Sequence, residues 1–211
     1  MWTQIQYALI YGWIKLHALL PMSVLYVLSD FLYFIVYRVI RYRVSVVRRN
    51  LKAAFPEKSN KELLLLEKKF YHHFADYVVE TLKLAHISLE ELQKRAYVQN
   101  PELIDQLMDK GNPCCLLLMG HFGNWEWYSG STSRFKDACL YQIYRPLNNK
   151  AVDKLFIHLR TKFGSFGIPK NDTGREVVRL VRNKVRSAVI FLADQTPSPS
   201  NLHYWTNFLH Q

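Results

Sequence analysis

The chain has 211 residues, 49% of them hydrophobic and 14% aromatic, which is enough to bury the core of one domain with an appendage but too little for two full domains. Charged residues make up only 21%, and there are 8 Gly and 8 Pro, so disordered, collagen-like and coiled-coil classes are excluded. The net charge of +11 indicates an anionic partner, which could be a nucleic acid, a lipid surface or an acidic protein.

The N-terminal segment is strongly apolar. Between Met1 and Tyr37 the only formal charges are Lys15 and Asp30. As one helix, residues 16–37 would extend roughly 33 Å, comparable with a hydrocarbon core of about 30 Å. Asp30 within the bilayer and a kink at Pro21 disfavour a simple crossing, so a monotopic hairpin is the alternative topology. The segment begins too late and is too long for a removable signal peptide.

A basic flank follows the apolar segment. Six cations and no acid occur between residues 38 and 52, and they are Arg38, Arg41, Arg43, Arg48, Arg49 and Lys52. The positive-inside rule places such a flank in the cytoplasm, and nucleic-acid binders rarely begin with so apolar a stretch. We therefore expect residues 1–43 to be a membrane anchor with a basic flank and expect no nucleic-acid partner. The alternative is a buried helical hairpin of a soluble protein followed by a solvated basic face.

Residues 44–111 are expected to be a helical lead-in. The segment Ser59 to Glu62 has the capping-box pattern, and apolar residues then recur at helical spacing as far as Ala85. Shorter helices are expected after Ser88 and after Pro101, the latter ending before Gly111.

Residues 112–211 are expected to form an α/β catalytic core. Apolar runs at 114–119, 138–144 and 188–193 are typical of strands buried on both faces. Segments with helical spacing at 125–133, 150–163 and 175–184 alternate with them, which predicts a mainly parallel sheet flanked by helices. In such sheets, ligands bind beyond the carboxyl ends of the strands.

Polar residues follow all three predicted strands, and they supply a base (His121), a cation (Arg145) and an acid (Asp194). His121 and Glu126 are five residues apart, and the glycines of the intervening turn would let the two side chains meet. Glu126 could then hold one imidazole nitrogen and leave the other to take a proton. Because no Ser or Cys nucleophile accompanies the pair, it suggests direct activation of a substrate hydroxyl.

The segment 120–126, GHFGNWE, resembles the H-x4-D/E motif of the glycerolipid acyltransferase superfamily and, in this form, the lauroyl/myristoyl acyltransferases of lipid A biosynthesis in Gram-negative bacteria. The resemblance extends over the whole chain and includes NLKAAFP at 50–56, YRPLNN at 144–149, Arg160, and Asp194. It implies a glycerol-3-phosphate acyltransferase-like fold. It also implies transfer of a fatty acyl group from acyl carrier protein to a hydroxyl of a lipid A precursor, at the cytoplasmic face of the inner membrane.

The resemblance also assigns roles to residues. His121 would be the general base and Glu126 its orienting partner. Arg160 and Asp194 match charged positions needed for activity or substrate binding, and Arg145 and Asn148 are weaker candidates for substrate contacts. No cofactor or metal is implied beyond the acyl thioester co-substrate. The implied partners are acyl carrier protein, an anionic glycolipid acceptor and the inner membrane. Family members continue beyond the third strand, so the C-terminal part of the family fold is expected to be missing.

Three other functions remain as alternatives. The first is a non-catalytic, membrane-anchored lipid-binding module, and the second is an acyl-coenzyme A-dependent glycolipid or lysophospholipid acyltransferase. The third is a metal hydrolase, because His72 and Asp76 are four residues apart on a predicted helix. Two ligands do not make a metal site, and no third ligand is placed by the sequence.

Overall fold

The computed structural model describes residues 2–195 and 204–209. Contacts within the chain divide it into two compact units, one of residues 1–19 and 81–195 and the other of residues 20–80 and 196–211. The expected divisions after residues 43 and 111 stay predictions, and in the structure the first helix belongs to the unit that contains the sheet.

The unit of residues 20–80 is helical. Its elements are α2 (Met22–Tyr33), the π-helix η1 (Phe34–Val39), α3 (Val44–Ala54) and α4 (Asn60–Lys83). The apolar segment 16–37 is not one helix as expected, because α1 ends at Ala18 and Pro21 caps the start of α2. Proline lacks the amide hydrogen that a continuous helix needs at that position. Among residues 2–195 and 204–209, one helix, at 22–39, is apolar enough and long enough to cross a membrane.

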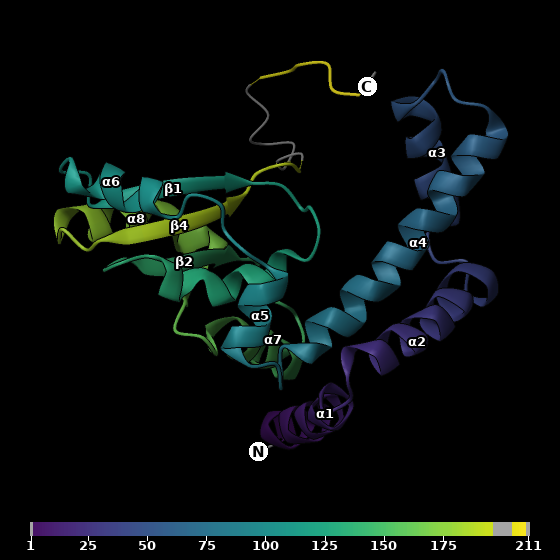
Figure 1. Ribbon diagram of the computed structural model, residues 1–211, viewed down its shortest axis with the longest axis horizontal. Coiled ribbons are helices and arrows are strands. Elements are labelled where there is room, and N and C mark those ends of the chain that lie inside the picture. Colours follow the sequence, from purple (N-terminus) through teal and green to yellow (C-terminus); the bar gives the residue numbers. More distant parts are fainter. Residues whose placement is uncertain (1, 196–203, 210–211) are drawn as a thin grey trace. The chain divides into compact units, whose positions relative to one another are not determined.

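One face of the 22–39 helix is bonded to α4, which runs alongside it (Figure 1). Tyr26 donates to Glu80 at 2.9 Å, and Ser29 donates to Asp76 at 2.6 Å. Further along, the Tyr37 hydroxyl donates to Glu67 at 2.9 Å. Tyr26, Ser29 and Tyr37 of the apolar helix therefore have hydrogen-bond partners on α4.

The opposite face of the same helix is apolar and exposed. Five large side chains recur there at spacings of three and four residues, namely Val24, Val27, Leu28, Phe31 and Phe34.

The start of α4 has the predicted capping box, in which the Ser59 amide donates to Glu62 at 2.9 Å and the Glu62 amide to the Ser59 hydroxyl at 3.4 Å.

The other unit contains a parallel sheet of four strands in the order β1-β4-β2-β3 (Figure 1). The strands are β1 (Cys114–Met119), β2 (Cys139–Tyr144), β3 (Phe166–Pro169) and β4 (Ser187–Leu192). Three of them were predicted. The short β3 was missed, because four residues that include a glycine and a proline give little strand signal.

Helices cover both faces of this sheet, as an α/β fold requires. They are α5 (Leu89–Arg95), α6 (Glu102–Asp109), the 3-10 helix η2 (Trp125–Arg134), α7 (Lys150–Thr161), the short 3-10 helix η3 (Lys170–Asp172) and α8 (Thr173–Arg182). Met108 of α6 packs on the face that presents Ala188 and Ile190, and Leu180 of α8 packs on the face that presents Val189. The predicted mainly parallel α/β core is confirmed.

The helix α1 (Trp2–Ala18) packs against α7 within the same unit. Lys154 donates to the Gln4 side chain at 2.6 Å, and the rings of Tyr11 and His158 meet edge to face at 5.0 Å. At the other end of α1, the Lys83 ammonium group donates to the Ala18 carbonyl at 2.9 Å. Part of the predicted anchor is thus a structural element of the α/β unit.

Candidate active site

His121 and Asp194 are joined by two hydrogen-bond contacts at the carboxyl edge of the sheet. The His121 ring nitrogen Nδ1 lies 2.6 Å from Asp194 Oδ1, and the His121 backbone amide donates to Asp194 Oδ2 at 2.8 Å. Both oxygens of one carboxylate therefore bind one residue, once through the ring and once through the backbone. This arrangement fixes the position and the rotation of the imidazole.

The sheet order explains why these two residues meet. β1 and β4 are hydrogen-bonded neighbours in a register that pairs Met119 with Leu192, and the Ala193 amide donates to the Met119 carbonyl at 2.8 Å. His121 and Asp194 each follow the paired residue by two positions. A Cβ atom at position 120 would lie 3.4 Å from Asp194 Oδ2, which is an ordinary van der Waals distance, so the strand pairing and not the glycine accounts for the contact.

The electrostatics determine which ring nitrogen carries the proton. The His121 backbone amide and then its ring, both donating to the carboxylate, hold the pKa of Asp194 below its ordinary value. An ionised carboxylate can only accept hydrogen bonds, so Nδ1 must be the protonated nitrogen. In the neutral ring, Nε2 then has a free lone pair. The ring is a quarter exposed and meets Trp125 edge to face at 4.8 Å.

Glu126 binds Arg160 and not His121. The Arg160 Nε and NH2 groups donate to the two Glu126 oxygens at 2.7 and 2.6 Å. The Glu126 side chain is 4% exposed. The predicted contact between Glu126 and His121 is therefore corrected, since η2 presents Glu126 toward α7, whereas the strand pairing brings Asp194 to the imidazole. The catalytic roles of all four residues stay predictions.

The two remaining candidates, Arg145 and Asn148, are exposed in the loop between β2 and α7. Within the described part of the chain, no contact joins either side chain to His121, Asp194 or the Arg160–Glu126 pair. The next residue has a structural task, because the Asn149 side chain accepts from the amides of Ala151 and Val152 at the start of α7. The loop motif thus includes a helix cap.

The site offers two kinds of space. A cavity of about 30 Å³ lies beside Glu126 and Arg160, beneath the strand ends, which is room for about two water molecules. Apolar side chains are exposed close to His121 in the sequence, with Phe122 86% and Leu118 74% exposed. The surface around His121 therefore has room to contact an aliphatic chain, whereas the small cavity next to Glu126 does not.

Two other chemistries receive no support from the geometry. Burial raises the pKa of the Cys115 thiol in β1, so it is a poor nucleophile at neutral pH. His72 stacks on Tyr33 at 3.6 Å, and Asp76 accepts from Ser29. Over residues 2–195 and 204–209, no three His, Cys, Asp or Glu side chains are grouped closely enough to hold a metal ion.

Taken together, the strand ends hold an imidazole with one nitrogen fixed by a carboxylate and the other open to a substrate proton. A family model described as bacterial lipid A biosynthesis acyltransferase matches residues 2–205. A search of the curated proteins finds no match.

Proposed function

The chain belongs to the bacterial lipid A biosynthesis acyltransferases, and we propose that it transfers a fatty acyl group from acyl carrier protein to a hydroxyl of a lipid A precursor, with His121 as the general base. The observation that carries this proposal is the contact between His121 Nδ1 and Asp194, which leaves Nε2 with a free lone pair. The family resemblance alone would not distinguish which carboxylate serves the base.

In the proposed step, His121 Nε2 takes the proton of the acceptor hydroxyl. At the same time, the hydroxyl oxygen attacks the carbonyl carbon of the thioester. The C–S bond then breaks, and the departing thiolate takes the proton from the imidazolium. Asp194 keeps the ring in the required tautomer and stabilises its positive charge during the transfer. The Arg160–Glu126 pair acts as a positioning element, because it ties η2, which follows the His121 turn, to α7.

We propose acyl carrier protein as the donor because the net charge of +11 favours acidic and phosphorylated partners. Coenzyme A presents a smaller anion, so its use should depend less on ionic strength. Rates with carrier-protein donors should therefore fall more steeply as salt reduces the Debye length, which is about 10 Å at 0.1 M. Equal salt dependence of the two donors would favour a coenzyme A-dependent acyltransferase.

The membrane contact that we propose is monotopic. The polar face of the 22–39 helix is bonded to α4 from Tyr26 to Tyr37, and α4 carries charges along its length, so this pair of helices cannot enter the hydrocarbon core together. The exposed apolar stripe would instead lie in one leaflet. The basic flank that follows supports the cytoplasmic face of the inner membrane. Phe31→Glu should weaken sedimentation with lipid vesicles, whereas Tyr97→Glu, an exposed aromatic change elsewhere, should not.

The test of the proposed reaction is acyl transfer measured by mass spectrometry. The full chain is incubated with acyl carrier protein thioesters and a tetra-acylated lipid A precursor, and we expect the precursor to gain the mass of one acyl chain less one hydrogen. If the folded protein bound the precursor but transferred nothing from either donor class, the lipid-binding module would replace the enzyme as the assigned function.

A further inference from the structure

The turn that joins η1 to α3 has an unusual backbone. Arg41 and Arg43 adopt φ angles of 54° and 53°, in the left-handed region that residues with bulky side chains rarely occupy. A π-helix, itself rare, precedes the turn directly. Strain of this kind persists where the surrounding structure enforces it, and it gathers at functional sites.

This turn borders a cavity of about 340 Å³, a volume within the range of small-molecule sites. The cavity is lined by Tyr37, Arg38, Arg41, Val44, Arg48 and Leu64. Three arginines therefore line one space, and no acidic residue belongs to its lining. Such a wall attracts an anion and supplies planar, forked donors that match phosphate oxygens.

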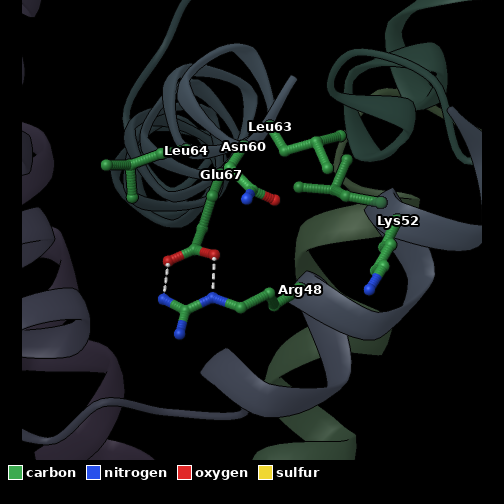
Figure 2. A pocket seen from close by; sticks show the side chains of 7 residues that line it. Arg48, Lys52, Asn60, Leu63, Leu64 and Glu67 are labelled. Atoms are coloured by element: carbon green, nitrogen blue, oxygen red, sulfur yellow. Dashed lines mark hydrogen bonds and ion pairs between the residues drawn. The ribbon is translucent and has the colours of Figure 1, made fainter. Parts of the chain in front are cut away.

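Of the three arginines that line the cavity, Arg48 is paired with a buried acid. Glu67 is almost fully buried, and it accepts from Arg48 Nε at 2.9 Å and from Arg48 NH2 at 2.8 Å (Figure 2). This pair fixes Arg48 in place. Within residues 2–195 and 204–209, no ion pair joins Arg38 or Arg41 to an acid, while Arg38 lies over the Tyr37 ring at 5.2 Å. Arg38 and Arg41 thus make no direct ion pair in this part of the protein, and the charge of Arg41 acts on Glu67 only at longer range.

The neighbourhood of the cavity suits an amphiphile. Arg38 lies four residues after Phe34, about one helical turn. The cavity therefore begins at the last residue of the exposed apolar stripe of the 22–39 helix. A second cavity of about 430 Å³ shares Arg48 and Leu64 with the first, and Leu51 and Leu63 add apolar walls to it (Figure 2). Lipid phosphates lie just outside the hydrocarbon layer, close to the depth at which an amphipathic helix lies in one leaflet.

From this arrangement we infer that the arginine cavity (Tyr37, Arg38, Arg41, Val44, Arg48 and Leu64) binds the phosphodiester of an anionic membrane phospholipid. Arg38 and Arg41 contact the phosphate, Arg48 is held ready by Glu67, and the apolar stripe contacts the acyl chains. The site orients the protein on the leaflet. In a nonspecific electrostatic attraction, by contrast, every cation of the basic flank would contribute equally to the affinity for lipid. The site does not depend on the proposed acyl transfer, and its test includes no acyl donor.

The experiment titrates the full chain in uncharged maltoside micelles with dihexanoyl phosphatidylglycerol and follows the phosphorus NMR signal. We expect saturable binding that Arg38→Gln with Arg41→Gln weakens by about tenfold or more, since charge-assisted hydrogen bonds are lost. The matched control is Arg49→Gln with Lys61→Gln, which removes two exposed charges of the same unit outside the cavity. The control should retain wild-type affinity. Equal loss in both double variants would overturn the site.

Two further measurements keep the inference testable. Inorganic phosphate and glucosamine 1-phosphate should compete poorly, and displacement of the lipid by either at equal concentration would overturn the phospholipid assignment. Arg41→Gly removes a guanidinium but suits the left-handed backbone, so lipid affinity should fall while the melting temperature does not. If Arg41→Gly kept full affinity, Arg41 would not contact the phosphate, and the inference would be wrong.

Discussion

Two carboxylates lie near the carboxyl edge of the sheet, and their surroundings differ sharply. Glu126 is closed off by Arg160, with both oxygens bonded and a side chain only 4% exposed. Asp194 is 43% exposed and binds a ring that is itself partly open to solvent. The first arrangement is suited to holding η2 against α7, and the second is suited to a proton transfer. The acid of the sequence motif is thus buried and pairs with an arginine, while the acid that contacts His121 follows another strand.

The largest expected effect is the loss of acyl-transfer rate when the His121 imidazole is removed. His121→Ala should lower the rate of acyl transfer by about 10²- to 10⁴-fold, the usual contribution of a general base. Its melting temperature should remain near that of the wild type, because the ring is partly exposed. The matched control is His86→Ala, an exposed histidine in the turn after α4. Near-normal turnover by folded His121→Ala protein would remove His121 from the mechanism.

Breaking the buried Arg160–Glu126 pair should mainly lower the free energy of unfolding. Arg160→Ala leaves the Glu126 carboxylate buried without its partner and should lower the free energy of unfolding by about 3–5 kcal/mol, measured by urea denaturation. Replacing both residues, with Arg160→Met and Glu126→Leu, should recover most of that loss. Lys94→Ala breaks the exposed pair with Glu90 and should cost less than about 1 kcal/mol. A similar cost for Arg160→Ala and Lys94→Ala would contradict the structural role of the buried pair.

The exposed pair should respond in catalysis and hardly in stability. Asp194→Asn removes the charge but keeps an acceptor for Nδ1, so we expect kcat to fall by about 10- to 100-fold with little change in KM. Nitrogen NMR of the His121 ring should show a larger share of the other tautomer. Asp137→Asn, an exposed change elsewhere in the same unit, is the control. An unchanged tautomer together with unchanged kcat would show that Asp194 does not position the base.

The smallest effect concerns the second arginine–glutamate pair, in the helical unit. The hydrogen bonds from Arg48 hold the pKa of Glu67 below its ordinary value of 4.5, with a further contribution from the Tyr37 hydroxyl. A lowered pKa in the folded state stabilises the protein above pH 4.5, and this contribution is lost as the pH falls through the folded-state value. The melting temperature should therefore fall more steeply between pH 6 and pH 3 in the wild type than in Glu67→Gln. Parallel curves would rule out this linkage.

The sequence predicted most of the elements because their signals are local. Capping residues, a helical stripe and apolar runs placed α4, α5, α6 and three of the strands within a few residues. The order of those strands is not local information. Nothing in the segment 120–126 indicates that β4 rather than β2 lies beside β1, so Glu126, the nearest acid along the chain, was chosen as the partner of His121.

The sequence nevertheless contained a signal for the contact between His121 and Asp194. His121 and Asp194 stand at the same distance beyond their strands, and adjacent parallel strands would bring them together at the sheet edge. The left-handed backbone at Arg41 and Arg43 could not have been foreseen, because neither residue favours it intrinsically. That conformation depends on the helices on either side of the turn.

The position of β4 also sets an order of events during synthesis. β1 is made early, but its hydrogen-bonded neighbour ends only at Leu192, and α1 must likewise wait for α7. The helices of residues 22–80 have their partners nearby in the chain and can fold while the sheet is still incomplete. We therefore expect the helical unit to settle on the lipid surface while the ribosome is still at work, so that the α/β unit matures there and its unpaired strand β1 is kept near a membrane during the slowest stage of folding.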